Sequence, residues 1–420
     1  MTATRLHNDG GMSRGLLLLM SVATGLAVAG NYFTQPLLDL IGRELGLGPS
    51  LAALTVTAAQ GGYALGLILL VPLGDLVERR RLAVSLYAAT AVFLLMSATA
   101  ANGKVLLVST ALTALTSVGA QVVVPFAVTL APPDERGRVI GTVMTGLLFG
   151  ALLARTASGL LSELGGWRTA YWVNAVLMAL MAVLLRLFLP RLGGEGGHLS
   201  YPGLLRSTVA SFRYEPLLRS RAGIAALSMA SFNVLWTALT FLLVQSPYRW
   251  SASAIGMFGL VGAAGALTAS VAGRLADRGH VQIVTGAGTV LLLASWAAIA
   301  AGARSLVWLL VGVIVLDLAH KAVLNSNQNI IFALRPEARN RINSAFSTAF
   351  FLGGAVGSAL TSVVWVHSGW TGVCVLGAIF SFGTVAIWVV ERVTVDRAAG
   401  KPPKTSAHQG HDPKPAASAN

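Results

Sequence analysis

The sequence has few charged residues and a single cysteine. Asp, Glu, Lys and Arg make up 11% of the 420 residues, against roughly a quarter in soluble chains. With Cys374 as the only cysteine, a disulfide framework and a thiolate metal cluster are both excluded. There is no G-x-x-x-x-G-K-[ST] phosphate-binding loop, and no pairing of a nucleophile with a base stands out. We therefore expect neither an enzyme nor an ATP-driven pump, and no cofactor or metal.

Apolar residues are what the chain has in excess. They make up 55% of it, the mean hydropathy is +0.71, and 46 glycines accompany them. Small residues of this kind allow helices to pack closely in lipid. Twelve apolar segments reach the roughly 20 residues that cross a bilayer. They are 15–38, 51–73, 82–100, 105–131, 139–162, 169–189, 222–245, 252–273, 281–301, 305–332, 342–365 and 370–390.

Two stretches resemble each other at an offset of about 203 residues. The paired landmarks are Pro133 with Pro336, Arg136 with Arg339, Arg138 with Arg341, Gly150 with Gly353, Gly166-Trp167 with Gly369-Trp370, and Asp75 with Asp277. Such a repeat in a very apolar chain is typical of membrane transporters built from two halves. The sequence therefore predicts an all-α membrane protein of twelve transmembrane helices in two six-helix repeats.

The cationic residues give the expected orientation. With the N-terminus inside, the cytoplasmic segments hold 23 of the 30 Lys and Arg, and the outer loops hold five. We therefore expect a multi-pass protein of the bacterial inner membrane with both termini cytoplasmic. The predicted divisions are a cytoplasmic segment (1–14), two bundles (15–189 and 222–391), a basic linker (190–221) and a disordered tail (392–420). Because this distribution accounts for the net charge of +14, we expect no nucleic-acid partner.

The loop between the second and third segments resembles a signature of the major facilitator superfamily, roughly G-x-L-A-D-R-x-G-R-R. The second copy, 273–280, matches its first six positions, and the first copy keeps Leu73, Asp75, Arg79 and Arg80. The resemblance covers about residues 14–391 and implies the twelve-helix fold of that family. The strings QPLL, PLGDLVERRR, LLARTASG and RPEARNR further resemble a bacterial branch that exports small molecules.

The charges of this loop suggest a conformational latch. An Asp at a helix end accepts hydrogen bonds from arginines and from a neighbouring helix N-terminus, which would hold the halves together on the inside. The predicted latch residues are Asp75, Arg79, Arg80, Gly273, Asp277 and Arg278. The alternative is ordinary positive charge at cytoplasmic loops.

Charged residues inside the predicted membrane region are the candidate coupling site. Asp317, His320 and Lys321 lie deep in the tenth segment, where an ionisable group is costly unless it is paired or hydrated. Asp317 and Lys321 share a helix face, and His320 is close enough to couple. We expect Asp317 to release and rebind a proton. A purely structural ion pair, and a direct contact of Lys321 with an anionic substrate, are the alternatives.

Arg155, in the fifth segment, is the other cation expected in the membrane. Counting from the loops places it roughly 12 Å, and Asp317 roughly 20 Å, from the outer surface, which argues against a direct bond between them. The resemblance implies a cavity lined by the first, fourth, seventh and tenth segments. The candidate cavity residues are Asn31, Tyr32, Gln35, Gln121, Arg155, Asn233, Trp236, Asn325 and Gln328, with Gln60 as a further polar neighbour.

The favoured function is secondary active transport. We expect proton-coupled export of small amphipathic molecules by alternating access, with a small-molecule substrate, protons and the lipid bilayer as partners, and a monomer. Uptake of a small polar or anionic metabolite, by symport or facilitated diffusion, is the first alternative. A non-transporting membrane receptor is the second.

Overall fold

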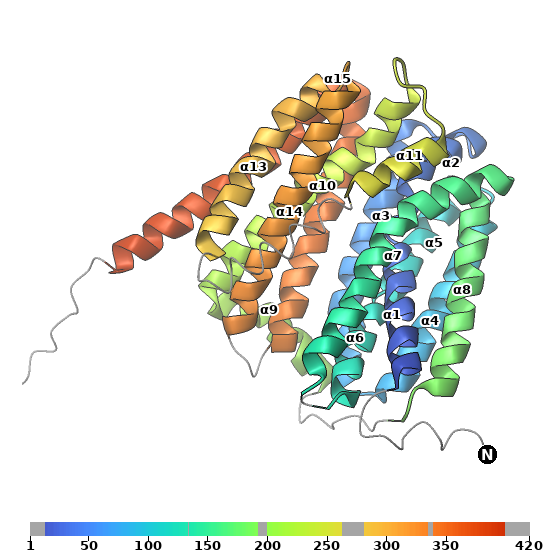
Figure 1. The fold of residues 1–420 in the computed structure, drawn as a ribbon, viewed down its shortest axis with the longest axis vertical. Helices are drawn as coiled ribbons and strands as arrows, with labels where there is room; N and C mark the ends of the chain where they lie inside the picture. Colours follow the sequence, from blue (N-terminus) through green and yellow to red (C-terminus); the bar gives the residue numbers. More distant parts are fainter. Residues whose placement is uncertain (1–12, 133, 192–199, 263–280, 335–338, 400–420) are drawn as a thin grey trace, which may run out of the picture.

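The computed structural model of the chain describes residues 13–132, 134–191, 200–262, 281–334 and 339–399, and all regular structure in these ranges is helical. Two bundles stand side by side, and α1 (Arg14–Ala29) begins at the lower end in Figure 1. Separate hydrophobic cores fill them, one built from residues 17–189 and the other from residues 218–374. The predicted all-α class is therefore confirmed.

The first bundle contains ten helical elements. Ser13 and Asn102 begin two of them by accepting hydrogen bonds from the backbone N–H groups of Leu16 and Val105. The elements are α1 (Arg14–Ala29), η1 (Gln35–Leu37), α2 (Leu38–Glu44), α3 (Pro49–Leu69), η2 (Val71–Asp75), α4 (Arg79–Ala98), α5 (Gly103–Thr116), α6 (Gly119–Leu130), α7 (Arg136–Gly165) and α8 (Trp167–Phe188).

The second bundle follows a connecting helix. Gly369, at φ 55° and ψ −148°, interrupts the last helix and turns the chain, a conformation that favours glycine. The elements are α9 (Tyr201–Tyr214), α10 (Pro216–Val244), α11 (Ala252–Phe258), η3 (Gly259–Gly262), α13 (Val281–Ala301), α14 (Leu306–Leu334) and α15 (Arg339–Ala399).

Each of the twelve predicted segments is mainly helical where the structure describes it. Nine stretches of the described chain are long and apolar enough to cross a membrane, and the 341–394 stretch contains the two predicted segments on either side of Gly369. The first and eighth segments correspond to shorter apolar helices, Arg14–Ala29 and Ala252–Gly262. The end of the eighth segment, 263–273, lies outside the described residues.

The sequence repeat has a packing counterpart. A Cβ built on Gly150 of α7 would come 2.2 Å from the carbonyl oxygen of Gly25 in α1, and one on Gly353 of α15 would come 2.1 Å from that of Ala226 in α10. Since real Cβ atoms do not approach so closely, each position requires glycine. The matched residues of the repeat therefore hold the first and fifth helices of each half together in the same way.

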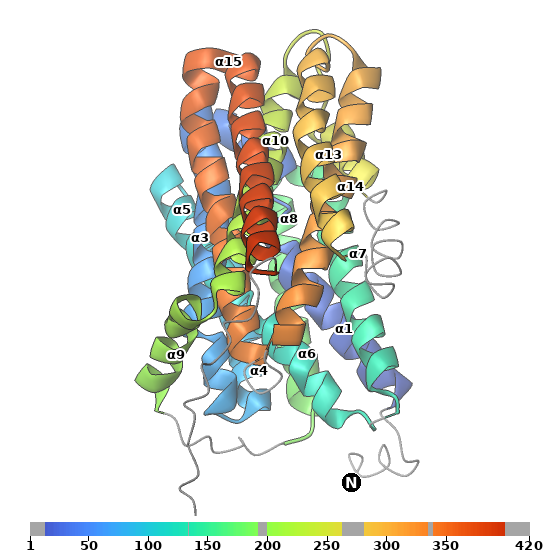
Figure 2. The ribbon, with the colours of Figure 1, turned by 90° about the vertical axis from the view of Figure 1, so that its left-hand side faces the viewer.

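Contacts between the halves run along two helix pairs. Along α3 and α15, Ser50 donates a hydrogen bond to the carbonyl of Ser362 at 2.6 Å, and Ser344 donates to that of Leu67 at 3.0 Å. Between α7 and α11, Thr156 donates to the carbonyl of Gly256 at 3.0 Å. Figures 1 and 2 both show α10 close to the junction, beside the first bundle.

Two predicted boundaries differ from the structure. Residues 216–221, assigned to the linker, are the first turns of α10, because Pro216 occupies a first-turn position that suits proline. The linker also contains α9, whose Tyr201 hydroxyl donates to the Leu69 carbonyl at 2.7 Å. The predicted disordered tail begins as helix, since α15 continues to Ala399. The rest of that tail, 400–420, lies outside the described residues.

Candidate functional site

Asp317 and Arg155 come together around one indole ring. Trp236 of α10 donates a hydrogen bond from Nε1 to Oδ1 of Asp317 at 3.3 Å. The guanidinium carbon of Arg155 lies 4.0 Å from the centre of the Trp236 ring. Both charged residues are buried, and within the described chain neither forms an ion pair with the other. Trp236 therefore joins α14 of the second bundle to α7 of the first.

Arg155 is held mainly by aromatic rings. Its guanidinium also lies 5.0 Å from the Tyr32 ring centre and 5.8 Å from that of Phe232, distances at which cation–π attraction operates. Its Nε donates a hydrogen bond to Oε1 of Gln35 at 2.7 Å. Its Nη2 has no partner among the residues that the structure describes. One edge of the guanidinium is thus available to an acceptor.

The short helix η3 makes room for both charges. A Cβ on Gly259 would lie 3.0 Å from Cβ of Arg155, and one on Gly262 would lie 2.6 Å from Oδ2 of Asp317. A larger residue at position 262 would therefore displace the carboxylate. At these two glycines, η3 therefore approaches Arg155 and Asp317 with its backbone and no side chain.

The three candidate coupling residues have different surroundings. Nδ1 of His320 lies 2.8 Å from the Ser228 hydroxyl, and its ring stacks on Phe232 and Phe350 at centroid distances of 4.6 and 5.8 Å. Lys321 is half-buried and makes no ion pair with Asp317 in the described structure. Asp317 therefore groups with Trp236 and Arg155, and His320 adjoins this group through Phe232, which also contacts Trp236. The two phenylalanines that stack on His320 are apolar, so their place in the site could not be predicted from the sequence.

The other candidate cavity residues divide into two groups. Asn31, Gln35 and Asn233 are buried, and both side-chain amide atoms of Asn31 and Asn233 have no hydrogen-bond partner in the described part of the chain. Gln121 donates to the Tyr63 hydroxyl at 3.4 Å, a marginal distance. Asn325 and Gln328 are half-buried, and no hydrogen bond joins either to the cluster in the described structure.

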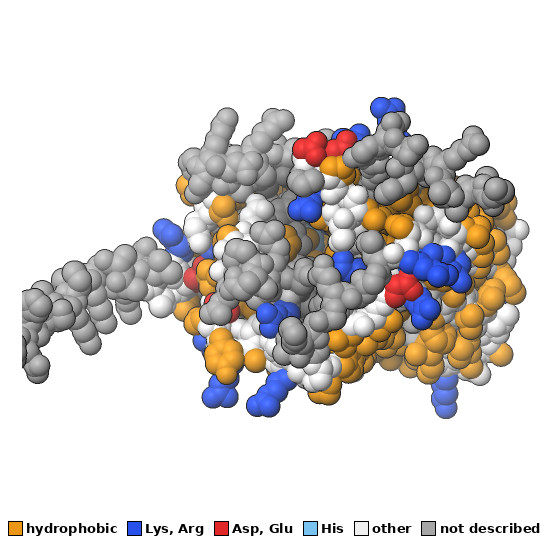
Figure 3. Space-filling model, turned by 90° about the horizontal axis from the view of Figure 1, so that it is seen from below, with side chains coloured by type: hydrophobic (Ala, Val, Ile, Leu, Met, Phe, Trp, Pro, Cys, Tyr) orange, Lys and Arg blue, Asp and Glu red, His pale blue; other side chains and the backbone are white. Residues whose placement is uncertain are grey.

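The predicted latch is described only in part. Gly273, Asp277 and Arg278 lie outside the described residues, as does the side chain of Asp75. Arg79 donates to the hydroxyl of Thr129 at 2.8 Å, and Arg80 donates to the carbonyl of Arg186. These partners belong to the first bundle, so the latch between the halves stays a prediction. Figure 3, the view from below Figure 1, shows more Lys and Arg than acidic side chains among the coloured residues of this end.

A second buried arginine lies at the start of α10. Arg221 makes an ion pair with Glu391 of α15 and donates to the side chains of Gln282, Thr285 and Asn327 at 2.9, 3.3 and 3.3 Å. Four helices meet at this residue. The cluster could not be predicted from the sequence, because its charged members are 170 residues apart and each lies beside a predicted span boundary.

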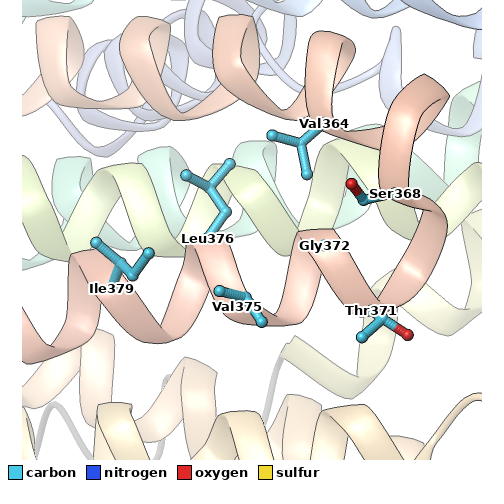
Figure 4. Close-up of a pocket in the computed structure, with 7 residues that line it drawn as sticks. All are labelled: Val364, Ser368, Thr371, Gly372, Val375, Leu376 and Ile379. Atoms are coloured by element: carbon cyan, nitrogen blue, oxygen red, sulfur yellow. The ribbon is translucent and has the colours of Figure 1, made fainter.

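An apolar groove lies elsewhere. It has a volume of about 430 Å³ and is lined by residues on both sides of the Gly369 turn, among them Val364, Ser368 and Ile379. Figure 4 shows that α15 supplies the labelled side chains from its two arms. None of the charged candidate residues that the structure describes lines it, so we keep it apart from the candidate site.

Paired bundles of spanning helices, with buried charges where the bundles meet, define the class of membrane transporters. The family model of the Major Facilitator Superfamily matches residues 20–320 and 222–418. The chain is 50% identical over 377 residues to the uncharacterized transporter YgaY of Escherichia coli O157:H7, covering 90% of this chain and 95% of that protein. The chain belongs to the Major Facilitator Superfamily and is a multi-pass membrane transporter, as its sequence signature indicated.

Two further similarities are more distant. A chloramphenicol resistance protein of Streptomyces lividans is 27% identical over 288 residues, covering 68% of this chain and 72% of that protein. The crystal structure of a mutant of the nucleoside transporter NupG superposes with a TM-score of 0.71 at 15% identity, covering 90% of this chain and 99% of that one. At 15% identity, the superposition supports the fold and carries no information on the substrate.

Proposed function

We propose that the protein exports small amphipathic molecules across the bacterial inner membrane in exchange for protons. The observation that carries this proposal is the Asp317 carboxylate, buried between the halves with the Trp236 N–H as its hydrogen-bond donor. A charged group in the membrane interior is costly unless it is paired or hydrated. Taking up a proton removes that cost, so Asp317 is suited to gain and lose a proton in each cycle.

Exchange follows if the substrate and the proton compete for Asp317. A neutral substrate that donates an O–H or N–H to the ionised carboxylate stabilises the deprotonated form. A proton on Asp317 removes the negative charge that strengthens this hydrogen bond, so each ligand lowers the affinity for the other. The aromatic rings of Tyr32, Trp236 and Phe232 around Arg155 offer an apolar surface for the body of the substrate.

The likeness to a chloramphenicol resistance protein supports export. The cationic residues support an arrangement with both termini cytoplasmic, since cytoplasmic loops carry the excess of Lys and Arg. A monomer suffices for this proposal, because both halves of the site come from one chain.

A second candidate function is uptake of an organic anion together with protons. The observation that favours it is the Nη2 atom of Arg155, which is buried and has no partner in the described structure. With Lys321 nearby in sequence to Asp317, two cations accompany one carboxylate. A proton on Asp317 would raise the net positive charge, so an anion and a proton would bind cooperatively and move in the same direction.

Everted membrane vesicles with an acidic interior test both functions. For export, adding chloramphenicol, lipophilic cations, amino acids, nucleosides or sugars outside should dissipate the proton gradient for one class of compound. For uptake, only compound loaded inside the vesicles should do so. We expect Asp317→Asn to abolish the response, since the amide cannot exchange a proton at neutral pH. Substrate binding should persist at reduced affinity, because the amide oxygen still accepts a hydrogen bond without the carboxylate charge.

The matched control is Glu135→Gln, which removes an acid that pairs with Arg138 at 2.8 Å on the exposed surface. It should retain the full response, because the site is far from this loop in the fold. Wild-type dissipation in the folded Asp317→Asn protein would exclude the proposed coupling role of Asp317.

A further inference from the structure

Two buried amides meet at the junction of the halves without hydrogen-bond partners. Gln60 of α3 and Asn233 of α10 are both fully buried. The nitrogen and the oxygen of each side chain have no partner in the described part of the structure. Buried amide groups are nearly always hydrogen-bonded in folded proteins, so four unpaired atoms at one place require an explanation. Two donor groups and two acceptor groups are thereby available at this position.

Gly354 of α15 brings the two side chains to the same place. A Cβ built on Gly354 would lie 2.6 Å from Nδ2 of Asn233 and 3.2 Å from Oε1 of Gln60. Both amides therefore face the bare backbone of α15, and an alanine at this position would enter the space between them. Three helices from the two halves, α3, α10 and α15, contribute one residue each.

The position adjoins the charged cluster. Asn233 precedes Trp236 by three residues on α10, so the two side chains leave the same face of that helix. Phe232, its neighbour, contacts Trp236 and stacks on His320, with ring centroids 6.1 and 4.6 Å apart. The amide of Asn233 therefore lies within one helical turn of the indole ring that contacts Asp317 and Arg155.

We propose that Gln60, Asn233 and Gly354 form a specificity subsite for a planar edge that both donates and accepts hydrogen bonds. A primary carboxamide, a lactam or the edge of a nucleobase has this pattern, because its N–H and its C=O lie side by side. Each can pair with an Asn or Gln side chain in two parallel hydrogen bonds. The inference rests on the proposed function, because it requires the substrate to enter between the halves. The subsite would bind the end of the substrate that is remote from the proton-exchanging carboxylate of Asp317.

Matched pairs of amides test the subsite by binding alone. The probes are 2-phenylacetamide and indole-3-acetamide, each compared with its N,N-dimethyl amide, which keeps the carbonyl and lacks the amide N–H groups. Calorimetric titration of the full-length protein in lipid nanodiscs, with no proton gradient, gives the affinities. We expect the primary amides to bind at least about tenfold more tightly, the effect of about 1.4 kcal/mol.

Gly354→Ala should abolish the preference, because the added methyl group occupies the subsite. The control is Gly61→Ala, one residue from Gln60, where an added Cβ has nothing within 4 Å. It should keep the wild-type preference. Gln60→Leu and Asn233→Leu repeat the test without added bulk in case Gly354→Ala does not fold.

Equal binding of the two members of each pair, or no binding of either, would overturn the subsite. So would an equal loss of both members in Gln60→Leu, which would mean that the amides only hold the halves together. The binding test uses no proton gradient, so its result is independent of the coupling role of Asp317. If the wild type prefers the primary amides and the Asp317→Asn variant still exchanges protons, the subsite is supported and the proposed coupling is rejected.

Discussion

The two buried arginines, Arg155 and Arg221, differ in how completely they are bound. Arg221 is fully buried, and its Nη1 and Nη2 atoms donate to Glu391, Gln282, Thr285 and Asn327. Arg155 is 6% exposed, has one side-chain hydrogen-bond acceptor in the described structure, Gln35, and otherwise contacts aromatic rings.

The difference indicates two uses of the same side chain. The ion pair and side-chain hydrogen bonds of Arg221 tie α10 to α13, α14 and α15 and occupy both of its terminal nitrogens. Only its Nε lacks a partner in the described structure, so no terminal N–H edge is left for a ligand. Arg155 lies between the bundles, and its Nη2 has no partner in the described structure. A charge that is buried but incompletely bound in a membrane protein is a candidate for ligand contact. The hydrogen-bond partners of a buried arginine therefore indicate its role better than its position along a membrane span.

The largest expected effect is on stability. Arg221→Met leaves the Glu391 carboxylate in the cluster without its counter-ion, and breaking a buried pair typically costs about 3–5 kcal/mol. Thermal unfolding in detergent should show a large loss for this variant and a small one for exposed Arg219→Met. The double variant Arg221→Met/Glu391→Gln should recover part of it. An unchanged unfolding temperature in Arg221→Met would show that the pair is not structural.

The next effect is on transport. Arg155→Met removes the guanidinium that lies on the Trp236 ring, and we expect a ten- to hundredfold loss of transport in proteoliposomes, about 1.4–2.8 kcal/mol. The unfolding temperature should fall by less than about 4 °C, because few hydrogen bonds are lost. A stability loss like that of Arg221→Met, with transport retained, would reverse the comparison between the two arginines.

The smallest effect concerns the side-chain acceptor of Arg155. Gln35→Leu removes a hydrogen bond at 2.7 Å, while the aromatic contacts of the guanidinium remain. A hydrogen bond contributes about 1 kcal/mol, so transport affinity should fall about fivefold. Concentration dependence of uptake into proteoliposomes measures this. A loss as large as that of Arg155→Met would mean that Gln35 alone positions the guanidinium.

Most of the fold was predictable because hydropathy and the repeat are both periodic along the chain. Gly150 and Gly353, matched as letters, prove to make the same close helix contact in each half. The break between α5 and α6 at Ser117–Val118, and the turns that separate α1 from α2, were not predicted. The residues on both sides of these breaks are equally apolar, so a hydropathy profile does not show where the helices end.

The residues of the candidate site could be predicted from the sequence, but their arrangement in space could be predicted only in part. Counting from the loops put Asp317 well below Arg155, whereas the helix ends in the structure place them at nearly equal depth. Arg155 is ten residues from the end of α7 at Gly165, and Asp317 is eleven from the start of α14 at Leu306. The role of Trp236 as the bridge, and the position of Gln60 beside Asn233, depend on contacts between helices that no single segment specifies.

The glycine contacts within each bundle have a mechanical consequence. Backbone pressed against backbone at Gly150 and at Gly353 leaves no side chain that could rotate to absorb a displacement. We therefore expect each bundle to move as a rigid body. In the proposed alternating-access cycle, the two bundles would then rotate against one another with little bending of their helices.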